Sequence, residues 1–438
     1  MKLDQAVSST RHHRAGGLSI VLALAISAIQ PVQAQLRGHG GPVRAVAVTS
    51  DGKTALSGSF DASTILWSLE RNAAARVLRF HDSAVNAVAI LLDGMLVTAS
   101  QDQRIALWDP GADRPATVLE GHEAPVVAIA VSPDGKTLAS ASWDRTVRLW
   151  PLAGGSASVL EGHKDNVNGV AFTPDGRHVI SAGYDLTVRI WPVAGGAPTI
   201  ATLPAPLSSI AVAPDGEIVA GGADGNIYFL SPTGEMRDRV EAGATPLIVV
   251  AVSPDGSLVT AAGIQSLITV VARGPRTVAR TLTGRGLPIW SATFLPDSRT
   301  LLAGGADHMI RRWNLTTGEE VETQGGAGDE DPLEAYKDDP GATVFRACVA
   351  CHTLKPDDGN RAGPTLAGIF GRRIATLPGY NFSPALTQLD IVWTPETVAK
   401  LFEVGPAAYT PGTKMPEQVI GDPADREALV RFLEKAAK

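Results

Sequence analysis

The segment LEGHEAPVVAIAVSPDGKTLASASWDRTVRLW (residues 119–150) recurs as LEGHKDNVNGVAFTPDGRHVISAGYDLTVRIW (residues 160–191). Aligning the chain on the acidic turn residue of this unit gives further registers at spacings of 39 to 42 residues: Asp61, Asp102, Asp144, Asp185, Asp224, Gln265 and Asp307. A period near 40 that opens with Gly-His and ends with Trp is the pattern of propeller blades. The repeat therefore predicts an all-β propeller over residues 35–323.

Local patterns inside the repeat support strands. Residues 43–48 and 126–131 alternate large and small apolar side chains, and Ser-Pro-Asp-Gly turns at Ser132 and Ser253 lead into the next strand. Asp and Gly form turns because Asp caps the backbone and Gly tolerates positive φ. The region resembles the WD-repeat family, in which each repeat supplies four antiparallel strands, so the seven registers imply seven blades.

In that family a His, a Ser or Thr, an Asp and a Trp hydrogen-bond across each blade. The set is complete in four repeats: His39, Ser57, Asp61, Trp67; His81, Thr98, Asp102, Trp108; His122, Ser140, Asp144, Trp150; and His163, Ser181, Asp185, Trp191. One histidine per blade is spread around a ring and does not converge, so we interpret these histidines as structural and not catalytic or metal-binding.

The last three repeats lose this set. Alanine replaces the hydroxyl at positions 220, 261 and 303, the histidine is replaced at positions 202, 243 and 285, and only Trp313 keeps the tryptophan. We expect these blades to depend more on apolar packing and to be looser. The ring can close through residues before Arg37 or through residues 319–323, and the family favours the N-terminal route.

A second motif, Cys348-Val349-Ala350-Cys351-His352, lies near the C-terminus. Two thiols three positions apart can each add across a vinyl group of one haem, and CxxCH is the signature of c-type haem attachment. The alternatives are a redox dithiol at a βαβ strand end and half of a zinc site, which needs a second ligand pair. Because the chain has only 2 cysteines, the motif favours one covalent haem c with His352 as an iron ligand.

Residues 339–438 resemble class I cytochrome c, an all-α fold, in its mitochondrial and bacterial c-two-like branch. The resemblance rests on GATVFRACVACHTL, GPTLAGIFGRR, GYNFSPAL, VWTPETVAKLF, YTPGTKMP and DPADREALVRFLEKAA, which occur in that order. It implies that Met415 is the second axial ligand and that the carbonyl of Pro364 accepts the other ring N–H of His352. A His/Met pair leaves no open coordination site, which suits electron transfer and not substrate binding.

The same resemblance assigns further residues. It implies propionate contacts from Arg372, Ser383, Trp393 and Thr413, and it brings Gly341 and Phe345 of the first helix against Leu429 and Phe432 of the last. Phe382 and Phe402 stand where the family often has tyrosines, so two hydroxyl donors near the haem are absent.

The N-terminus has the layout of a secretory signal peptide, which we place at residues 1–34. Lys2, Arg11 and Arg14 precede an apolar run over residues 18–29, and Val32-Gln33-Ala34 supplies small residues before a cleavage point. The run is short for a membrane span, and a residual membrane anchor is the alternative. Covalent haem attachment in bacteria follows export, so we expect a periplasmic protein.

The net charge of −7 gives no support to nucleic-acid binding. Acidic residues concentrate between residues 319 and 339, and residues 324–338 are expected to be an acidic linker. With no apolar periodicity, this segment should be a mobile tether that spans roughly 25 Å.

Three functions remain open from the sequence. The first is an electron carrier without a catalytic site of its own, whose propeller docks partner proteins and whose redox partners include an unknown donor and an unknown acceptor, a membrane complex being one candidate. The second is a redox enzyme in which the propeller holds another cofactor, and the third is an assembly protein or sensor that carries a haem. The WD-type polar residues favour the first, because they are used for structure.

Overall fold

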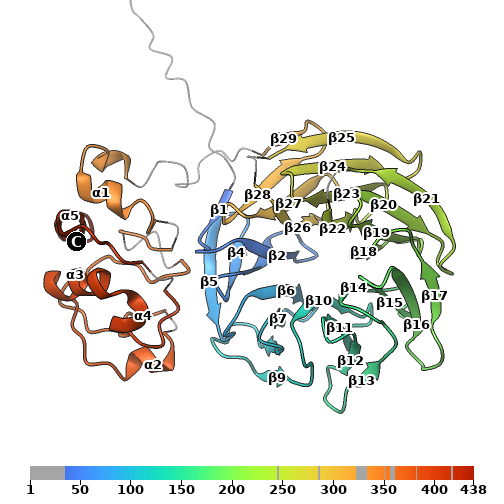
Figure 1. Cartoon of the computed structure of the whole chain (residues 1–438), viewed down its shortest axis with the longest axis horizontal. Helices are drawn as coiled ribbons and strands as arrows, with labels where there is room; N and C mark the ends of the chain where they lie inside the picture. The colour runs from blue at the N-terminus through green and yellow to red at the C-terminus, as the bar shows by residue number, and fades with distance from the viewer. Residues whose placement is uncertain are drawn as a thin grey trace, which may run out of the picture. The chain divides into compact units, whose positions relative to one another are not determined.

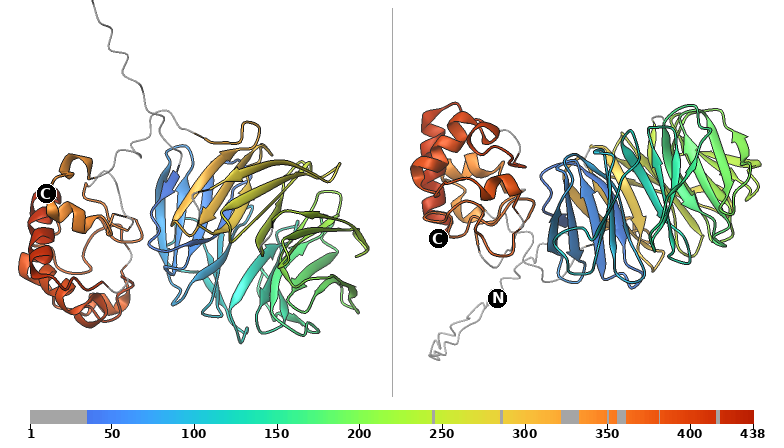
Figure 2. Two further views of the ribbon diagram at one scale, coloured as in Figure 1. Left: turned by 45° about the horizontal axis from the view of Figure 1, so that its top comes forward. Right: turned by 90° about the horizontal axis from the view of Figure 1, so that it is seen from below.

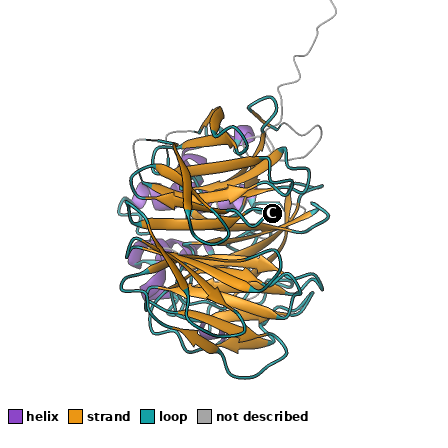
Figure 3. Cartoon of the chain, turned by 90° about the vertical axis from the view of Figure 1, so that its right-hand side faces the viewer, coloured by secondary structure: helices purple, strands orange, loops and turns teal. Residues whose placement is uncertain are grey.

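The computed structural model describes residues 35–243, 246–284, 287–321, 333–349, 351–355, 361–380, 382–415 and 418–438. The expected signal peptide and most of the expected acidic linker lie outside these residues, as does Arg285, which replaces the histidine of the last repeat. The described chain is a seven-bladed antiparallel propeller followed by a helical domain, which is the predicted fold class (Figures 1 and 3). In the described part, no helix combines the length and apolar character needed to cross a bilayer.

The first four blades are four-stranded sheets, and in each of them the chain runs from the innermost strand to the outermost. Blade 1 contains β2 (Val43–Val48), β3 (Thr54–Ser59), β4 (Ser63–Ser68) and β5 (Ala73–Arg79). Blade 2 contains β6 (Val85–Ile90), β7 (Leu96–Ser100), β8 (Ile105–Trp108) and β9 (Thr117–Leu119). Blade 3 contains β10 (Val126–Val131), β11 (Thr137–Ser142), β12 (Val147–Pro151) and β13 (Ser158–Leu160). Blade 4 contains β14 (Val167–Phe172), β15 (His178–Gly183), β16 (Thr187–Pro192) and β17 (Thr199–Thr202).

The remaining blades complete the ring. Blade 5 contains β18 (Leu207–Val212), β19 (Ile218–Gly222), β20 (Asn226–Leu230) and β21 (Met236–Glu241). Blade 6 contains β22 (Leu247–Val252), β23 (Leu258–Gly263), β24 (Leu267–Ala272) and β25 (Thr277–Thr283). Blade 7 contains β26 (Ile289–Phe294), β27 (Thr300–Gly305) and β28 (Met309–Asn314). Neighbouring innermost strands are in contact all the way round, including β2 with β26, and Figure 2 shows the blades side by side around the ring.

Both ends of the propeller close blade 7. β1 (Gln35–Arg37) pairs with the first half of β28, with Leu36 opposite Ile310. β29 (Glu319–Glu320) pairs with the second half, with Glu320 opposite Trp313. The N-terminal strand is therefore the main closing strand, as expected, and the C-terminal segment adds a shorter one on the same edge.

The His, Ser/Thr, Asp and Trp sets of blades 1–4 are formed. In blade 3 the Ser140 hydroxyl accepts from Trp150 Nε1 at 2.8 Å and lies 2.7 Å from His122 Nε2, whose Nδ1 is 2.6 Å from Asp144. Burial alone would raise the pKa of Asp144, but the hydrogen bonds from His122 and Thr146 outweigh it and lower that pKa below its usual range. Each histidine is used inside its own blade, so the structural interpretation is confirmed.

Blades 5–7 use other polar contacts besides apolar packing. In blade 5 the Tyr228 hydroxyl donates to Asp224 at 2.5 Å, and in blade 7 Arg311 pairs with Asp307 and Glu320. Between blades 5 and 6, Glu217 is buried and accepts from Arg273 at 2.9 Å and from Arg276. The expectation that apolar packing replaces the lost set was therefore incomplete.

Each innermost strand carries a β-bulge at its second residue, where the pairing register skips one position. A bulge re-aims the side chain that it leaves unpaired. These seven residues, which we call the bulge ring, lie at the end of the propeller where the innermost strands begin: Arg44, Asn86, Val127, Asn168, Ser208, Ile248 and Trp290. Asn86 donates to the Val126 carbonyl at 3.0 Å, and Asn168 donates to the Leu207 carbonyl at 2.9 Å, so the ring links neighbouring blades.

The helical domain starts with η1 (Glu334–Tyr336) and α1 (Pro340–Phe345) and continues with α2 (Pro384–Thr387), α3 (Pro395–Val404), α4 (Pro406–Tyr409) and α5 (Pro423–Ala436). Asp339, Thr394 and Asp422 cap the N-termini of α1, α3 and α5 with their side chains, which satisfies backbone N–H groups that a helix leaves free.

α1 and α5 cross closely. A Cβ on Gly341 would lie 2.5 Å from the Cβ of Phe432, so only glycine allows this approach. The rings of Phe345 and Phe432 are 5.4 Å apart, and Leu429 lies in the same core cluster. The expected contact between the first and last helices is therefore present.

Candidate haem site

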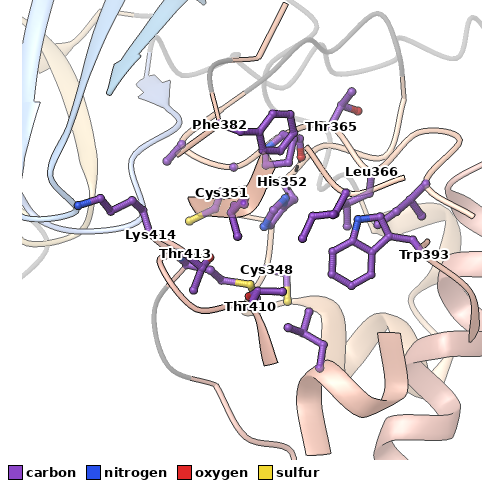
Figure 4. Close-up of a pocket in the computed structure, with 18 of the residues that line it drawn as sticks. Cys348, Cys351, His352, Thr365, Leu366, Phe382, Trp393, Thr410, Thr413 and Lys414 are labelled. Carbon is purple, nitrogen blue, oxygen red and sulfur yellow. Dashed lines mark hydrogen bonds between the residues drawn. The ribbon is translucent and has the colours of Figure 1, made fainter. Parts of the chain in front are cut away.

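The described part of the CxxCH segment follows α1, which ends at Phe345, in hydrogen-bonded turns. Cys348 N donates to the Phe345 carbonyl at 2.7 Å, and His352 N donates to the Cys348 carbonyl at 2.9 Å. Residues four apart lie on the same face of a helix, so this turn presents Cys348 and His352 together. Figure 4 shows Cys348, Cys351 and His352 grouped at one pocket.

A short loop holds the imidazole of His352. Its Nδ1 lies 2.8 Å from the Pro364 carbonyl, which is the hydrogen bond expected from the sequence. Burial lowers the pKa of His352, and the hydrogen bond to Pro364 opposes this only in part. The ring is therefore neutral at pH 7, with Nδ1 as the donor and Nε2 free to bind a metal, since a carbonyl partner on one ring nitrogen fixes the tautomer.

Gly363 lies directly against this imidazole. Its N–H donates to the Cys351 carbonyl at 2.7 Å. A Cβ at this position would lie 2.3 Å from Cε1 of His352 and 2.6 Å from its Nδ1. Glycine is therefore required at position 363 for the imidazole to stay where it is.

The two thiols are not set up as a redox or zinc site. Burial raises the pKa of Cys348 to about 12 and that of Cys351 to about 11. Both are protonated at neutral pH, whereas redox dithiols and zinc ligands are thiolates. Among the described residues, no group of three His, Cys, Asp or Glu side chains is placed to hold a metal ion. Protonated thiols, one buried and one half-buried, beside a neutral histidine in a largely apolar pocket fit a covalent haem.

A tight turn brings Met415 to the same pocket. Gly412 has a φ of +81°, and a Cβ there would lie 2.3 Å from Ala385. Thr413 N donates to the Thr410 carbonyl at 3.0 Å, and Met415 N donates to the Thr413 hydroxyl at 3.1 Å. The Pro-Gly turn thus fixes the loop that carries Met415.

All nine residues singled out in the sequence line this one pocket: Cys348, Cys351, His352, Pro364, Arg372, Ser383, Trp393, Thr413 and Met415. Two of the four residues assigned to the propionates also hold the pocket wall. Ser383 donates to the Gly412 carbonyl at 2.7 Å, and Arg372 donates to the carbonyls of Thr365 and Ala367. Gly371 and Trp393 are joined by a backbone hydrogen bond of 2.8 Å, which holds the segment carrying Arg372 beside Trp393.

Most of the rest of the wall is apolar, and it includes residues that sequence reasoning missed. Leu366, Ile369, Val398, Leu401, Leu429 and Leu433 line the pocket. Tyr380 supplies a hydroxyl despite the phenylalanines at positions 382 and 402: it donates to the Ala362 carbonyl at 2.6 Å, and its ring is 4.7 Å from that of Phe382. The signal for Tyr380 was its place two residues before Phe382, within GYNFSPAL.

Comparisons with known proteins agree with the two folds. The family model described as IFT122 first beta-propeller matches residues 84–330, and the one described as WD domain, G-beta repeat, matches residues 30–68. The chain belongs to this propeller family. Its propeller is followed by a cytochrome c domain, since the Cytochrome c family model matches residues 339–437.

Curated relatives of this propeller protein match the cytochrome c domain. A cytochrome c from Cochliobolus lunatus is 41% identical over 99 residues, which are 22% of this chain and 91% of the relative. A cytochrome c2 from Rhodopila globiformis is 38% identical over 112 residues, which are 25% of this chain and 97% of the relative. The domain therefore carries a covalently bound haem c and has a role in haem electron transfer.

Proposed function

We propose that this protein is an exported single-electron carrier in which His352 and Met415 are the axial ligands of one haem c. In this proposal the propeller is a docking module for redox partners. The observation that carries the proposal is the pocket itself: an oriented neutral imidazole, a loop-held thioether, one buried thiol and one half-buried thiol line one largely apolar cavity.

A haem c with both axial positions filled by the protein supplies one-electron transfer without an open coordination site. The residues of the chain supply the rest. The Pro364 carbonyl keeps the His352 tautomer and raises the basicity of Nε2, while the apolar wall excludes water. Low dielectric around the site and a thioether ligand both favour the reduced state, so we expect a high reduction potential.

An enzyme with a second cofactor in the propeller is the weaker proposal. Such a cofactor needs polar ligands that converge on one point. The recurring His and Asp residues of blades 1–4 bond within their own blades instead, as His163 does with Asp185 and Ser181 at 2.9 and 2.7 Å.

Export is part of the proposal because covalent haem attachment and the N-terminal sequence point to the same compartment. The expected signal peptide predicts a mature chain that starts near Gln35, in the periplasm. Cell fractionation with haem staining tests this: the stained band should appear in the periplasmic fraction, at the mass of a chain without residues 1–34. A cytoplasmic band would contradict it.

Two substitutions test the site. The double variant Cys348→Ser/Cys351→Ser should lose all haem stain on a denaturing gel, because both thioether bonds are gone. Met415→Ala should abolish the sulfur-to-iron charge-transfer band and lower the reduction potential. Met236→Ala is the matched control, because Met236 is an exposed residue in a blade 5 strand, and it should change neither. An unchanged band in Met415→Ala would assign the ligand to another residue.

A further inference from the structure

The bulge ring contains a single charged residue, Arg44. The other six positions are Asn86, Val127, Asn168, Ser208, Ile248 and Trp290. Arg44 Nη1 donates to the Trp290 carbonyl at 3.3 Å, and its guanidinium carbon is 5.6 Å from the centroid of the Trp290 ring. No described residue forms an ion pair with it. The positive charge of Arg44 is therefore uncompensated within the described propeller.

The surroundings of Arg44 lower its pKa. Burial is the main cause, and the one titratable group that opposes it is the Tyr184 phenol, from blade 4 on the far side of the ring from blade 1. An arginine that is partly withdrawn from water and has no carboxylate beside it is costly for the fold, since buried charges are normally paired. A bound carboxylate would remove that cost.

Exposed aromatic side chains lie at the same end of the propeller as Arg44. The residue before each acidic turn lies beside the start of the innermost strand: Phe60 N donates to the Pro42 carbonyl at 3.0 Å, and Tyr184 N donates to the Asn166 carbonyl at 2.9 Å. Three of these residues are aromatic and exposed, with Phe60 at 43%, Trp143 at 42% and Tyr184 at 42%. The corresponding residues of the other blades are also uncharged: Gln101, Ala223, Ile264 and Ala306.

Trp290 adds an unused donor. Its Nε1 is buried and has no hydrogen-bond partner among the described residues, and its ring is 5.6 Å from that of Phe60. A buried donor without a partner costs about 1–3 kcal/mol. The face thus combines one free cation, one free N–H donor and exposed aromatic rings.

We propose that this end of the propeller binds an aspartate or glutamate side chain of an extended partner segment, with the carboxylate on Arg44 and its apolar neighbours on Phe60, Trp143 and Tyr184. The inference rests on the proposed docking role and gives it a site and a chemistry. One cation in the bulge ring, beside exposed aromatic rings, matches one carboxylate flanked by apolar residues. A polyphosphate backbone would need several cations, and the bulge ring offers one.

The probe for the test is a phage-displayed library of short random peptides, panned on the haem-loaded full chain. Selected peptides should share one acidic residue with apolar neighbours. A fluorescein-labelled copy of the strongest peptide then gives the Kd by anisotropy. Arg44→Gln should weaken binding at least about tenfold, because a charge-assisted contact is lost, and amidation of the peptide carboxylate should do the same.

The matched control is Arg177→Gln, which removes the same charge from an 81%-exposed side chain at a turn of blade 4 and should leave the Kd unchanged. In the double-mutant comparison, Arg44→Gln and the amidated peptide together should cost no more than either change alone. Phe60→Ala should also weaken binding, by less than Arg44→Gln does.

Several results would overturn the proposal: no acidic peptides selected, an unchanged Kd for Arg44→Gln, or equal loss for Arg177→Gln. Displacement of the peptide by inorganic phosphate or single-stranded DNA at similar concentration would indicate a general anion site. Tighter peptide binding after Asp329→Asn, Glu330→Gln and Asp331→Asn would assign the face to the chain's own acidic segment. Peptide binding is measured without electron transfer, so its failure with an intact haem spectrum leaves the electron-carrier proposal standing.

Discussion

Replacing Gly363 with alanine should disturb the haem site through one methyl group. The new Cβ would lie 2.3, 2.6 and 2.7 Å from Cε1, Nδ1 and Nε2 of His352. It would therefore press against the face of the imidazole and not against the far end of a flexible chain. The backbone cannot move away easily, because the Gly363 N–H is bonded to the Cys351 carbonyl at 2.7 Å.

The size of the effect follows from these distances. Ordinary van der Waals contact for a Cβ begins at 3.4 Å, so the imidazole must move by about 1 Å. A shift of that size breaks the 2.8 Å contact between His352 Nδ1 and the Pro364 carbonyl, which contributes about 1 kcal/mol. Overpacking of this kind costs about 1–3 kcal/mol in total. The weakened Nε2 ligand should make part of the ferrous haem high-spin and able to bind carbon monoxide.

The assay compares the haem-loaded Gly363→Ala variant with Gly421→Ala. A Cβ on Gly421 meets nothing within 4 Å, so this control changes a glycine of the same domain without a clash. Both variants are examined by reduced spectra with and without carbon monoxide, by reduction potential and by thermal unfolding. Only Gly363→Ala should bind carbon monoxide, change the potential and unfold at a lower temperature. If the two variants behave alike, the loop does not hold the imidazole in the way described.

Three further predictions concern the propeller and its connection. Ser140→Ala removes the shared partner of Trp150 and His122, so the free energy of unfolding measured by calorimetry should fall by about 2–5 kcal/mol, whereas Ser158→Ala at an exposed position should leave it unchanged. Ala303→Ser gives a partner to Trp313 Nε1, which has none among the described residues, and should raise the free energy of unfolding by about 1 kcal/mol. A fall in that free energy for Ala303→Ser would contradict this reasoning. Burial lowers the pKa of His163, and hydrogen bonds lower the pKa of Asp185 although burial opposes them. The unfolded state therefore binds more protons than the folded state, and the melting temperature should fall as the pH drops below about 6.5. A melting temperature that stays constant between about pH 7 and 4 would refute this reasoning. A fragment of residues 335–438 should keep the haem spectrum and potential of the full chain but lose rate with the physiological donor, as expected for a tethered carrier; a shifted potential would refute the tether.

Most of the propeller was accessible from the sequence because its information is periodic. Each blade repeats the same strand pattern and the same polar set, so Asp61 through Asp307 could be aligned without any structure. The ion pairs of Glu217 with Arg273 and Arg276 were not accessible, because they join different blades across more than fifty positions. The repeat of about 40 residues does not contain these residues at fixed positions, so it does not predict such an ion pair.

The residues of the haem pocket likewise fall into those that the sequence identified and those that it did not. Residues with distinctive chemistry, such as Cys348, His352 and Met415, can be recognised in the sequence because each belongs to a short motif. The need for glycine at position 363 comes from a close approach between two segments, and the hydroxyl of Tyr380 reaches the Ala362 carbonyl eighteen positions away. Both depend on where the backbone passes, which spacing along the chain does not encode.

Because two strands, β1 and β29, share the edge of β28, one of them can detach under force while the other keeps the propeller closed. Any pull exerted through the C-terminal segment loads β29 first, which has two strand pairs, Glu319 with Asn314 and Glu320 with Trp313, and the ion pair of Glu320 with Arg311. Detaching those two residues would lengthen the connection by about 7 Å, at about 3.3 Å per extended residue. The propeller would remain closed, because β1 stays paired with Met309, Ile310 and Arg311 of β28. The reach of the haem domain can thus grow under load without opening the propeller.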